Sequence, residues 1–214
     1  MRKDTRIVLA LDETDKSRAL DVVSKVAEHI DAVKINWPLV LTAGPEIITK
    51  ISDISDVVCD FKVADIPNTV KLIVENTVAL GASAVIVHAF TGEDSMLAAV
   101  EAAGKAEIYA VTEMSHPGGK TFTALHAEDM ARMGVRCGVA GFIAPATRPE
   151  RIVDIRRIVG DRKILSPGVG TQGGSASAAI NAGADYVIVG RAIYRSDDPE
   201  AVVKAMESEI RSVL

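Results

Sequence analysis

Eight short apolar runs recur along the chain, and each is followed by a more polar stretch. Dividing the 214 residues by eight gives about 27 residues per unit, room for one strand and one helix. The runs are often β-branched and are apolar throughout, as expected for parallel strands buried on both faces. They span Arg6–Leu11, Ala32–Ile35, Val57–Val63, Ala84–Val87, Glu107–Val111, Val139–Ala144, Lys163–Ser166 and Tyr186–Val189.

Helical patterns lie between the runs. Residues Ser17–His29, Asn68–Leu80 and Pro199–Val213 carry apolar side chains at helical spacing. Glycines that precede the runs stand where helices are expected to end, namely Gly81, Gly134, Gly160 and Gly183. Residues Ser115–Phe122 show neither pattern.

The repeated units predict an α/β protein with one (β/α)8 barrel domain over residues 1–214. An open, doubly wound sheet is the alternative. We find no linker, low-complexity segment or change of composition that would mark a second domain. In a barrel, catalytic groups lie at the C-terminal ends of the strands and in the loops that follow them.

The composition excludes several classes of protein. With 24 Lys and Arg against 29 Asp and Glu, the formal charge is −5, which argues against nucleic-acid binding through overall basicity. Two cysteines, Cys59 and Cys137, make no disulfide framework and are expected in the core. The first apolar run is too short for a signal peptide, and no run is long enough to span a membrane. We therefore expect a cytoplasmic protein.

Charged residues cluster at the end of the third run. Asp60 and Lys62 are two positions apart on a strand, so their side chains share a face. Asp65 follows just past the strand end, where it can fold back or reach a neighbouring subunit. Lys34, from the second run, can complete an alternating array of charges. Neighbouring carboxylates favour the charged form of Lys62. A purely structural salt-bridge network is the alternative interpretation.

A glycine-rich segment follows the seventh run. Residues 168–173 match the pattern G-x-G-x-x-G, but a dinucleotide site would need an acidic residue at the end of the next strand. That strand ends instead at Gly190 and Arg191. Glycines after strand seven and a Gly-Arg pair after strand eight fit the phosphate site common in such barrels.

A metal site has little support. The spacings H-x-H, C-x-x-C and H-E-x-x-H do not occur, which disfavours zinc. Asp12, Asp60 and Asp65 could hold Mg²⁺, but Lys62 supplies a competing positive charge. His88, at the end of the fourth run, is expected to be structural.

The segment from Asp60 to Thr69 resembles the D-x-K-x-x-D-I-P-x-T signature of the orotidine 5′-monophosphate decarboxylase family. Residues 9–12 are similar to that family's first strand and residues 33–34 to its second. Residues 166–172 and 189–191 are similar to its phosphate-binding segments, so the resemblance covers essentially the whole chain. The short length is similar to the archaeal type.

This resemblance implies a homodimer of barrels in which the partner completes each site. It implies that Lys62 donates a proton to C6 of the pyrimidine and that Asp60 lies beside the departing carboxylate. Lys34 would bridge Asp60 and the ribose, and Asp65 would come from the other subunit. No metal, flavin or pyridoxal is implied.

The resemblance also implies a set of substrate-binding residues. Ile66 and Thr69 would join Asp65 from the partner, whereas Asp12 would bind the ribose and Ser115 the base. Pro167 and Val169 would line a closing loop. Gln172 would link base and phosphate, and Gly190 and Arg191 would bind the phosphate.

Three other functions stay open. Metal-dependent sugar-phosphate decarboxylases and aldolases of the same superfamily resemble the chain at the third strand, but they characteristically carry glutamate where this chain has Lys34. A Schiff-base aldolase would need an uncharged Lys62, which the flanking carboxylates disfavour. A non-catalytic phosphate-binding barrel would be supported by a charge lost from the cluster, and none is lost.

Overall fold

The eight predicted runs form the eight strands of a closed parallel barrel in the computed structural model, which describes Met1 and residues 3–214. Each strand pairs with the next one in sequence, and β8 pairs with β1 to close the ring. The strands are β1 (Ile7–Leu11), β2 (Ala32–Ile35), β3 (Val57–Val63), β4 (Ala84–His88), β5 (Glu107–Val111), β6 (Gly141–Ile143), β7 (Lys163–Pro167) and β8 (Tyr186–Val189).

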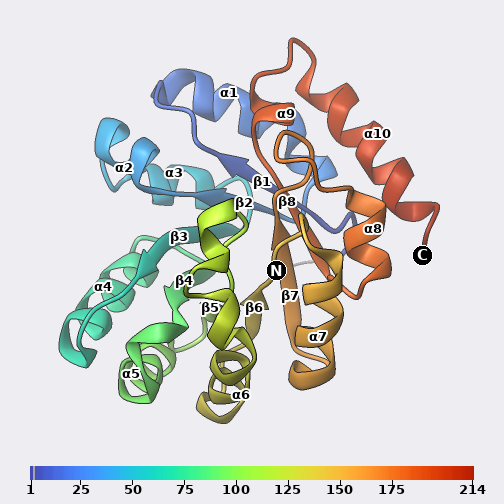
Figure 1. The fold of residues 1–214 in the computed structure, drawn as a ribbon. Coiled ribbons are helices and arrows are strands. Elements are labelled where there is room, and N and C mark those ends of the chain that lie inside the picture. The colour runs from blue at the N-terminus through green and yellow to red at the C-terminus, as the bar shows by residue number, and fades with distance from the viewer. Residues whose placement is uncertain (2) are drawn as a thin grey trace.

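Helices surround the strands in sequence order, as Figure 1 shows. The (β/α)8 barrel is therefore confirmed, and the open doubly wound sheet is excluded, because an open sheet has no pairing between its first and last strands. The helices are α1 (Lys16–Val26), α2 (Trp37–Ala43), α3 (Ile47–Ser52), α4 (Pro67–Ala79), α5 (Glu93–Ala103), α6 (Ala127–Cys137), α7 (Pro149–Val159), α8 (Ala176–Asn181), α9 (Arg191–Tyr194) and α10 (Pro199–Arg211).

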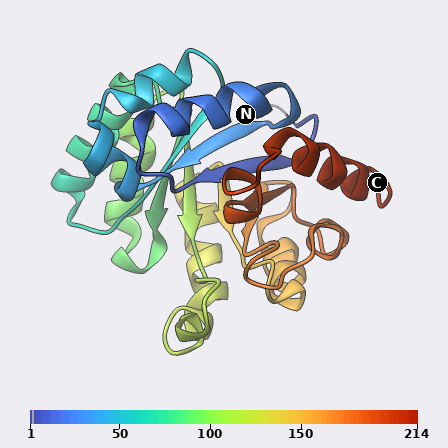
Figure 2. The same ribbon diagram turned by 90° about the horizontal axis from the view of Figure 1, so that it is seen from above.

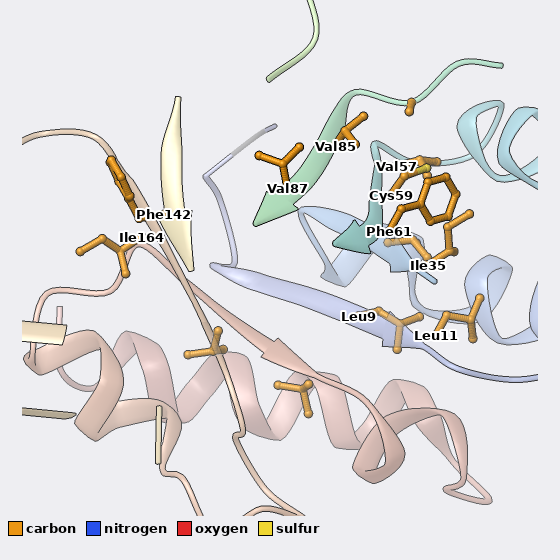
Figure 3. Close-up of a cluster of buried hydrophobic side chains, with 14 of the residues drawn as sticks. Leu9, Leu11, Ile35, Val57, Cys59, Phe61, Val85, Val87, Phe142 and Ile164 are labelled. Carbon is orange, nitrogen blue, oxygen red and sulfur yellow. The ribbon is translucent and has the colours of Figure 1, made fainter. Parts of the chain in front are cut away.

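Apolar side chains fill two layers, one on each face of the strands. Alternate residues face the barrel interior, where Val58, Ile86 and Tyr109 belong to one buried cluster. The other residues pack against the helices, and Figure 3 shows Cys59 and Phe61 of β3 in that outer layer. Burial raises the pKa of the Cys59 thiol to about 12, which suits a core position. The continuous apolar runs in the sequence reflect this burial on both faces.

Three of the four glycine predictions are confirmed. Gly160 is the C-cap of α7, and Gly81 and Gly183 directly follow the C-caps of α4 and α8. The prediction for Gly134 is wrong, because α6 continues past it to Cys137 and ends at Gly138, which has φ +81°. A Cβ at position 134 would lie 2.6 Å from the Phe142 ring, so the small residue there allows close helix–strand packing.

The segment that showed no pattern in the sequence is a long connection after β5. It contains two short 3-10 turns, Pro117–Lys120 and Ala124–His126, before α6 begins. In Figure 2 this yellow-green connection projects from the body of the barrel. Within the described residues, no helix has both the length and the apolar character needed to cross a membrane.

Candidate active site

A cavity of about 240 Å³ opens at the C-terminal ends of the strands. All eight strands or the residues directly after them contribute to its wall, so it lies over the centre of the barrel. Its apolar floor comes from Ala10, Ile86, Val111, Ile143 and Ile188. The polar wall and the loops above it comprise Asp12, Lys34, Asn36, Asp60, Lys62, Glu113, Met114, Ser115, Pro167, Gly168, Val169, Thr171, Gln172, Gly190 and Arg191.

Four charged side chains form a connected row along one side of the cavity. Lys62 Nζ lies 2.8 Å from both carboxylate oxygens of Asp60. Lys34 Nζ lies 3.0 Å from Asp60 Oδ2 and 4.0 Å from Asp12 Oδ1. The signs of charge therefore alternate from Asp12 through Lys34 and Asp60 to Lys62, and each ammonium group has a carboxylate beside it.

Asp60 is a buried carboxyl group whose pKa is lowered. Burial by itself raises the pKa of the Asp60 carboxyl, but the charges of Lys34 and Lys62 outweigh burial and hold that pKa below its usual value. Asp60 is therefore a carboxylate at neutral pH, although only 8% of it is exposed. Two ammonium groups held by a buried carboxylate form a preorganised positive site at the barrel mouth.

The backbone of β3 is irregular where it carries this row. Cys59 pairs with Val85 and Val63 with Val87, so β3 advances four residues while β4 advances two. Lys62, within this bulge, has φ +44°, a left-handed value that is uncommon for residues other than glycine. Bulges often re-aim side chains next to functional sites. Here Asp60 and Lys62 still face the same cavity despite the irregular pairing.

Another part of the cavity wall is formed by the loops after β7 and β8. Gly168, Gly170 and Gly173 have φ values of +103°, +76° and +91°, and the loop is closed by a 2.9 Å hydrogen bond from Gly170 N to Gly174 O. Gly190 precedes α9, and Arg191 begins it. The backbone amides and the Arg191 guanidinium at this end suit an anion such as a phosphate.

No sequence pattern predicted the contacts that hold the backbone of Met114 and Ser115. Glu113 is 1% exposed and binds Arg148 Nε at 2.8 Å and Arg151 Nε at 2.9 Å. Arg148 also donates to the carbonyl of Met114 at 2.6 Å, and Thr147 Oγ1 donates to the carbonyl of Ser115 at 3.1 Å. These contacts join residues more than 30 positions apart, and no local spacing in the sequence indicates them.

Two further polar residues lie near the row of charges. Asn36 lines the cavity and follows Lys34 by two positions. Because side chains alternate along a strand, this spacing could have predicted that Asn36 faces the site. His88 ends β4, and its Nδ1 is buried without a hydrogen-bond partner among the described residues. Burial and the charge of Lys62 lower the pKa of His88, which makes it a neutral imidazole beside a charged cluster.

Three sequence-predicted site residues do not line this cavity in the described chain: Asp65, Ile66 and Thr69. Asp65 is exposed, accepts a 2.7 Å hydrogen bond from the Ile66 amide, and accepts another from Ser95 Oγ at its own carbonyl. Ile66 is 65% exposed at the start of α4. Thr69 lines a separate apolar groove of about 320 Å³ beside Trp37 and Phe61. The other predicted site residues come together around one cavity.

Comparison with known proteins gives a consistent result. The family model described as Orotidine 5′-phosphate decarboxylase / HUMPS family matches residues 5–206. The chain is 50% identical to the orotidine 5′-phosphate decarboxylase of Methanococcoides burtonii, over 98% of this chain and 99% of that protein. It is 44% identical to that of Thermococcus kodakarensis, over 99% of this chain and 100% of the other.

Solved structures resemble the whole barrel. The orotidine 5′-monophosphate decarboxylase of Methanocaldococcus jannaschii, complexed with the inhibitor BMP, has a TM-score of 0.91 and 41% identity, covering 95% of this chain and 97% of that one. The Pyrococcus horikoshii enzyme has a TM-score of 0.90 and 44% identity, covering 96% and 99%. With the family model matching nearly the full length and relatives this similar, the chain belongs to the orotidine 5′-phosphate decarboxylase / HUMPS family.

Proposed function

We propose that this chain decarboxylates orotidine 5′-monophosphate to uridine 5′-monophosphate, the step that completes uridylate in pyrimidine biosynthesis. The observation that carries the proposal is the row Asp12–Lys34–Asp60–Lys62 in a cavity where the loops after β7 and β8 suit a phosphate. A charged cluster at one end and an anion-binding loop at the other match a substrate with a reacting carboxylate and a distant phosphate. The protein acts as one barrel domain over residues 1–214.

Lys62 is the proton donor in the proposed reaction. The bond between C6 and the carboxylate breaks, CO2 leaves, and the electron pair stays on C6. The Lys62 ammonium stabilises this negative charge and transfers a proton to C6, after which the neutral amine regains a proton from water. The 2.8 Å contacts with Asp60 support this role because they hold the ammonium in place before substrate binds. The reaction needs no redox cofactor, since no electrons leave the substrate.

Asp60 contributes through its charge. It is a buried carboxylate, and the substrate carboxylate would lie beside it, so the two repel each other. That repulsion falls as CO2 departs, which favours the reaction in the forward direction. Lys34 balances the Asp60 charge at 3.0 Å and reaches toward Asp12, which is placed to bind a ribose hydroxyl.

Binding energy from the distant phosphate supports the chemistry at C6. Arg191 and the Gly190 amide bind the phosphate, Gln172 links it to the base, and Ser115 holds the pyrimidine. Pro167 and Val169 lie in the loop that closes over the substrate. Interactions far from the reacting carbon can stabilise a closed loop and an oriented base.

Replacing Arg191 tests the phosphate end. Arg191→Ala is expected to raise KM for orotidine 5′-monophosphate by about 100-fold, because a charge-assisted hydrogen bond to a dianion is lost. Steady-state kinetics measure this, with Arg195→Ala as the control because Arg195 lies one turn away and does not line the cavity of the described chain. An unchanged KM in Arg191→Ala would contradict the assignment of Arg191 to phosphate binding.

The functional unit is a homodimer whose subunits share their active sites. Asp65, Ile66 and Thr69 lie on the edge of their own barrel and outside its cavity, which supports a role in the neighbouring subunit. Ile66 exposes 65% of its surface at the start of α4, so its side chain is available to a neighbouring subunit. With Asp65 delivered from the partner, the row of charges gains a second carboxylate near Lys62.

A metal-dependent sugar-phosphate decarboxylase or aldolase of the same superfamily is the second candidate, because such enzymes resemble the chain at the third strand. The position of Lys34 disfavours it. The ammonium group lies between the carboxylates of Asp12 and Asp60, the two groups in this row that Mg²⁺ would use. A divalent cation placed there would be repelled by both Lys34 and Lys62.

The proposed function is tested with orotidine 5′-monophosphate in excess EDTA. A change in the ultraviolet absorbance of the pyrimidine, with uridine 5′-monophosphate as the product, is the expected result. The matched reaction contains Mg²⁺ in place of EDTA, and the two rates are expected to agree. Turnover of a pentulose or hexulose phosphate with Mg²⁺, and none of orotidylate, would contradict the proposal and favour the metal-dependent lyases.

A further inference from the structure

Trp37 contacts β3 at Phe61, through both the ring and the backbone carbonyl of that residue. It is the only tryptophan in the sequence and the first residue of α2, directly after β2. Its indole stacks on Phe61, with ring centroids 4.4 Å apart and ring planes 23° apart. The indole Nε1–H donates a 3.2 Å hydrogen bond to the carbonyl of Phe61. Because it remains 45% exposed, burial alone does not account for its position.

The carbonyl that Trp37 binds belongs to the peptide joining Phe61 to Lys62. Lys62 is the residue with φ +44°, in the bulge where β3 loses its regular register with β4. On the other side, the last residue pair between β2 and β3 is Ile35 with Cys59. Phe61 and Trp37 each lie two residues beyond that pair. The indole N–H therefore extends the hydrogen bonding between these segments past the point where strand pairing ends.

We propose that Trp37 is a positioning residue for Lys62. The stack and the hydrogen bond hold the Phe61–Lys62 peptide in the orientation that gives Lys62 its left-handed φ, and that conformation directs the ammonium group to Asp60. A left-handed lysine persists only when its surroundings determine it. Trp37 supplies part of those surroundings from outside the cavity. This inference rests on the proposed role of Lys62. It adds Trp37, which does not line the cavity of the described chain, to the residues that act on the reaction.

Trp37→Phe is the first test, because it keeps an aromatic ring for the stack and removes the donor. We expect kcat to fall about tenfold, with KM and the Kd of uridine 5′-monophosphate within about twofold of the parent values. A residue with a merely structural role would lower the amount of active protein or change binding as well. Unchanged kcat would overturn the inference, as would an equal loss in kcat and in affinity.

Leu72→Ala is the matched control. Leu72 lines the same apolar groove as Trp37 and is 51% exposed, but it lies on α4 and its aliphatic side chain has no donor. We expect this variant to keep the parent kcat. If it reproduces the loss seen in Trp37→Phe, the effect belongs to the groove as a whole, and the inference is overturned. Sedimentation of both variants at the assay concentration checks their oligomeric state. A loss of kcat in Trp37→Phe that disappears at high protein concentration would also overturn the inference.

A stability cycle tests the link to Lys62 without using activity. Glycine adopts φ +44° without strain, so Lys62→Gly can keep this backbone conformation and removes the strain that Trp37 is proposed to offset. Trp37→Phe is expected to lower the urea midpoint by more in Lys62→Gly than in the parent protein, at fixed protein concentration, because in the parent the loss of the contact also releases the strain at Lys62. Equal decreases in the two backgrounds would overturn the inference. If Lys62→Ala were fully active, the proposed function would fail instead, whatever the stability cycle gave.

Discussion

Lys62→Ala is expected to lower kcat for orotidine 5′-monophosphate by about 10⁴-fold or more. The substitution removes both the charge that stabilises the C6 carbanion and the proton that C6 receives, and each effect is typically worth at least about 100-fold. Binding of the product, uridine 5′-monophosphate, should change little, because the phosphate end of the cavity is untouched. Single-turnover absorbance and isothermal titration calorimetry measure the two quantities separately.

The matched control for this prediction is Lys71→Ala. Lys71 is 53% exposed on α4, where it pairs only weakly with Glu75 at 3.9 Å. Its removal changes the net charge of the protein by the same amount as Lys62→Ala, but Lys71 does not line the cavity in the described part of the chain. Full activity in Lys71→Ala and almost none in Lys62→Ala is the expected pair of results. A Lys62→Ala protein that retains nearly the parent kcat would contradict the proposed mechanism.

Mixing two inactive variants is expected to restore activity. If Asp65 serves the neighbouring subunit, a dimer of one Lys62→Ala chain and one Asp65→Ala chain contains one intact site and one site that lacks both groups. Random exchange makes half of the dimers mixed, so recovery approaches about one quarter of the parent activity. The measurement is the decarboxylation rate after the two proteins are mixed in equal amounts and incubated.

Subunit exchange must be followed in the same samples. Native mass spectrometry of chains that carry tags of different mass reports the fraction of mixed dimers. Recovered activity should rise in proportion to that fraction. Mixed dimers without activity would place Asp65 in its own subunit's site, contrary to the proposal. A protein that stays monomeric throughout would contradict the shared site more directly.

The sequence by itself determined the barrel. Apolar runs buried on both faces, repeated eight times at nearly equal spacing, admit few other arrangements, and several runs match the observed strands at both ends. It also determined which groups meet at the mouth, because residues at the C-terminal ends of parallel strands share one end of a barrel. Lys34 and Asp60 meet there from neighbouring strands, and Arg191 lines the same cavity from the segment after β8.

Tertiary structure decided the details that depend on contacts between distant segments. Alternation along β3 put Asp60 and Lys62 on one face, but it did not predict the bulge or the left-handed backbone of Lys62. Gly134 carries the same local signal as a helix cap, but it lies inside α6, where the absence of a Cβ leaves room for the Phe142 ring. Local pattern determines which face a residue takes, whereas strained conformations and close contacts follow from how separate elements pack. The hydrogen bond from Trp37 to the peptide before Lys62 is a contact of this second kind.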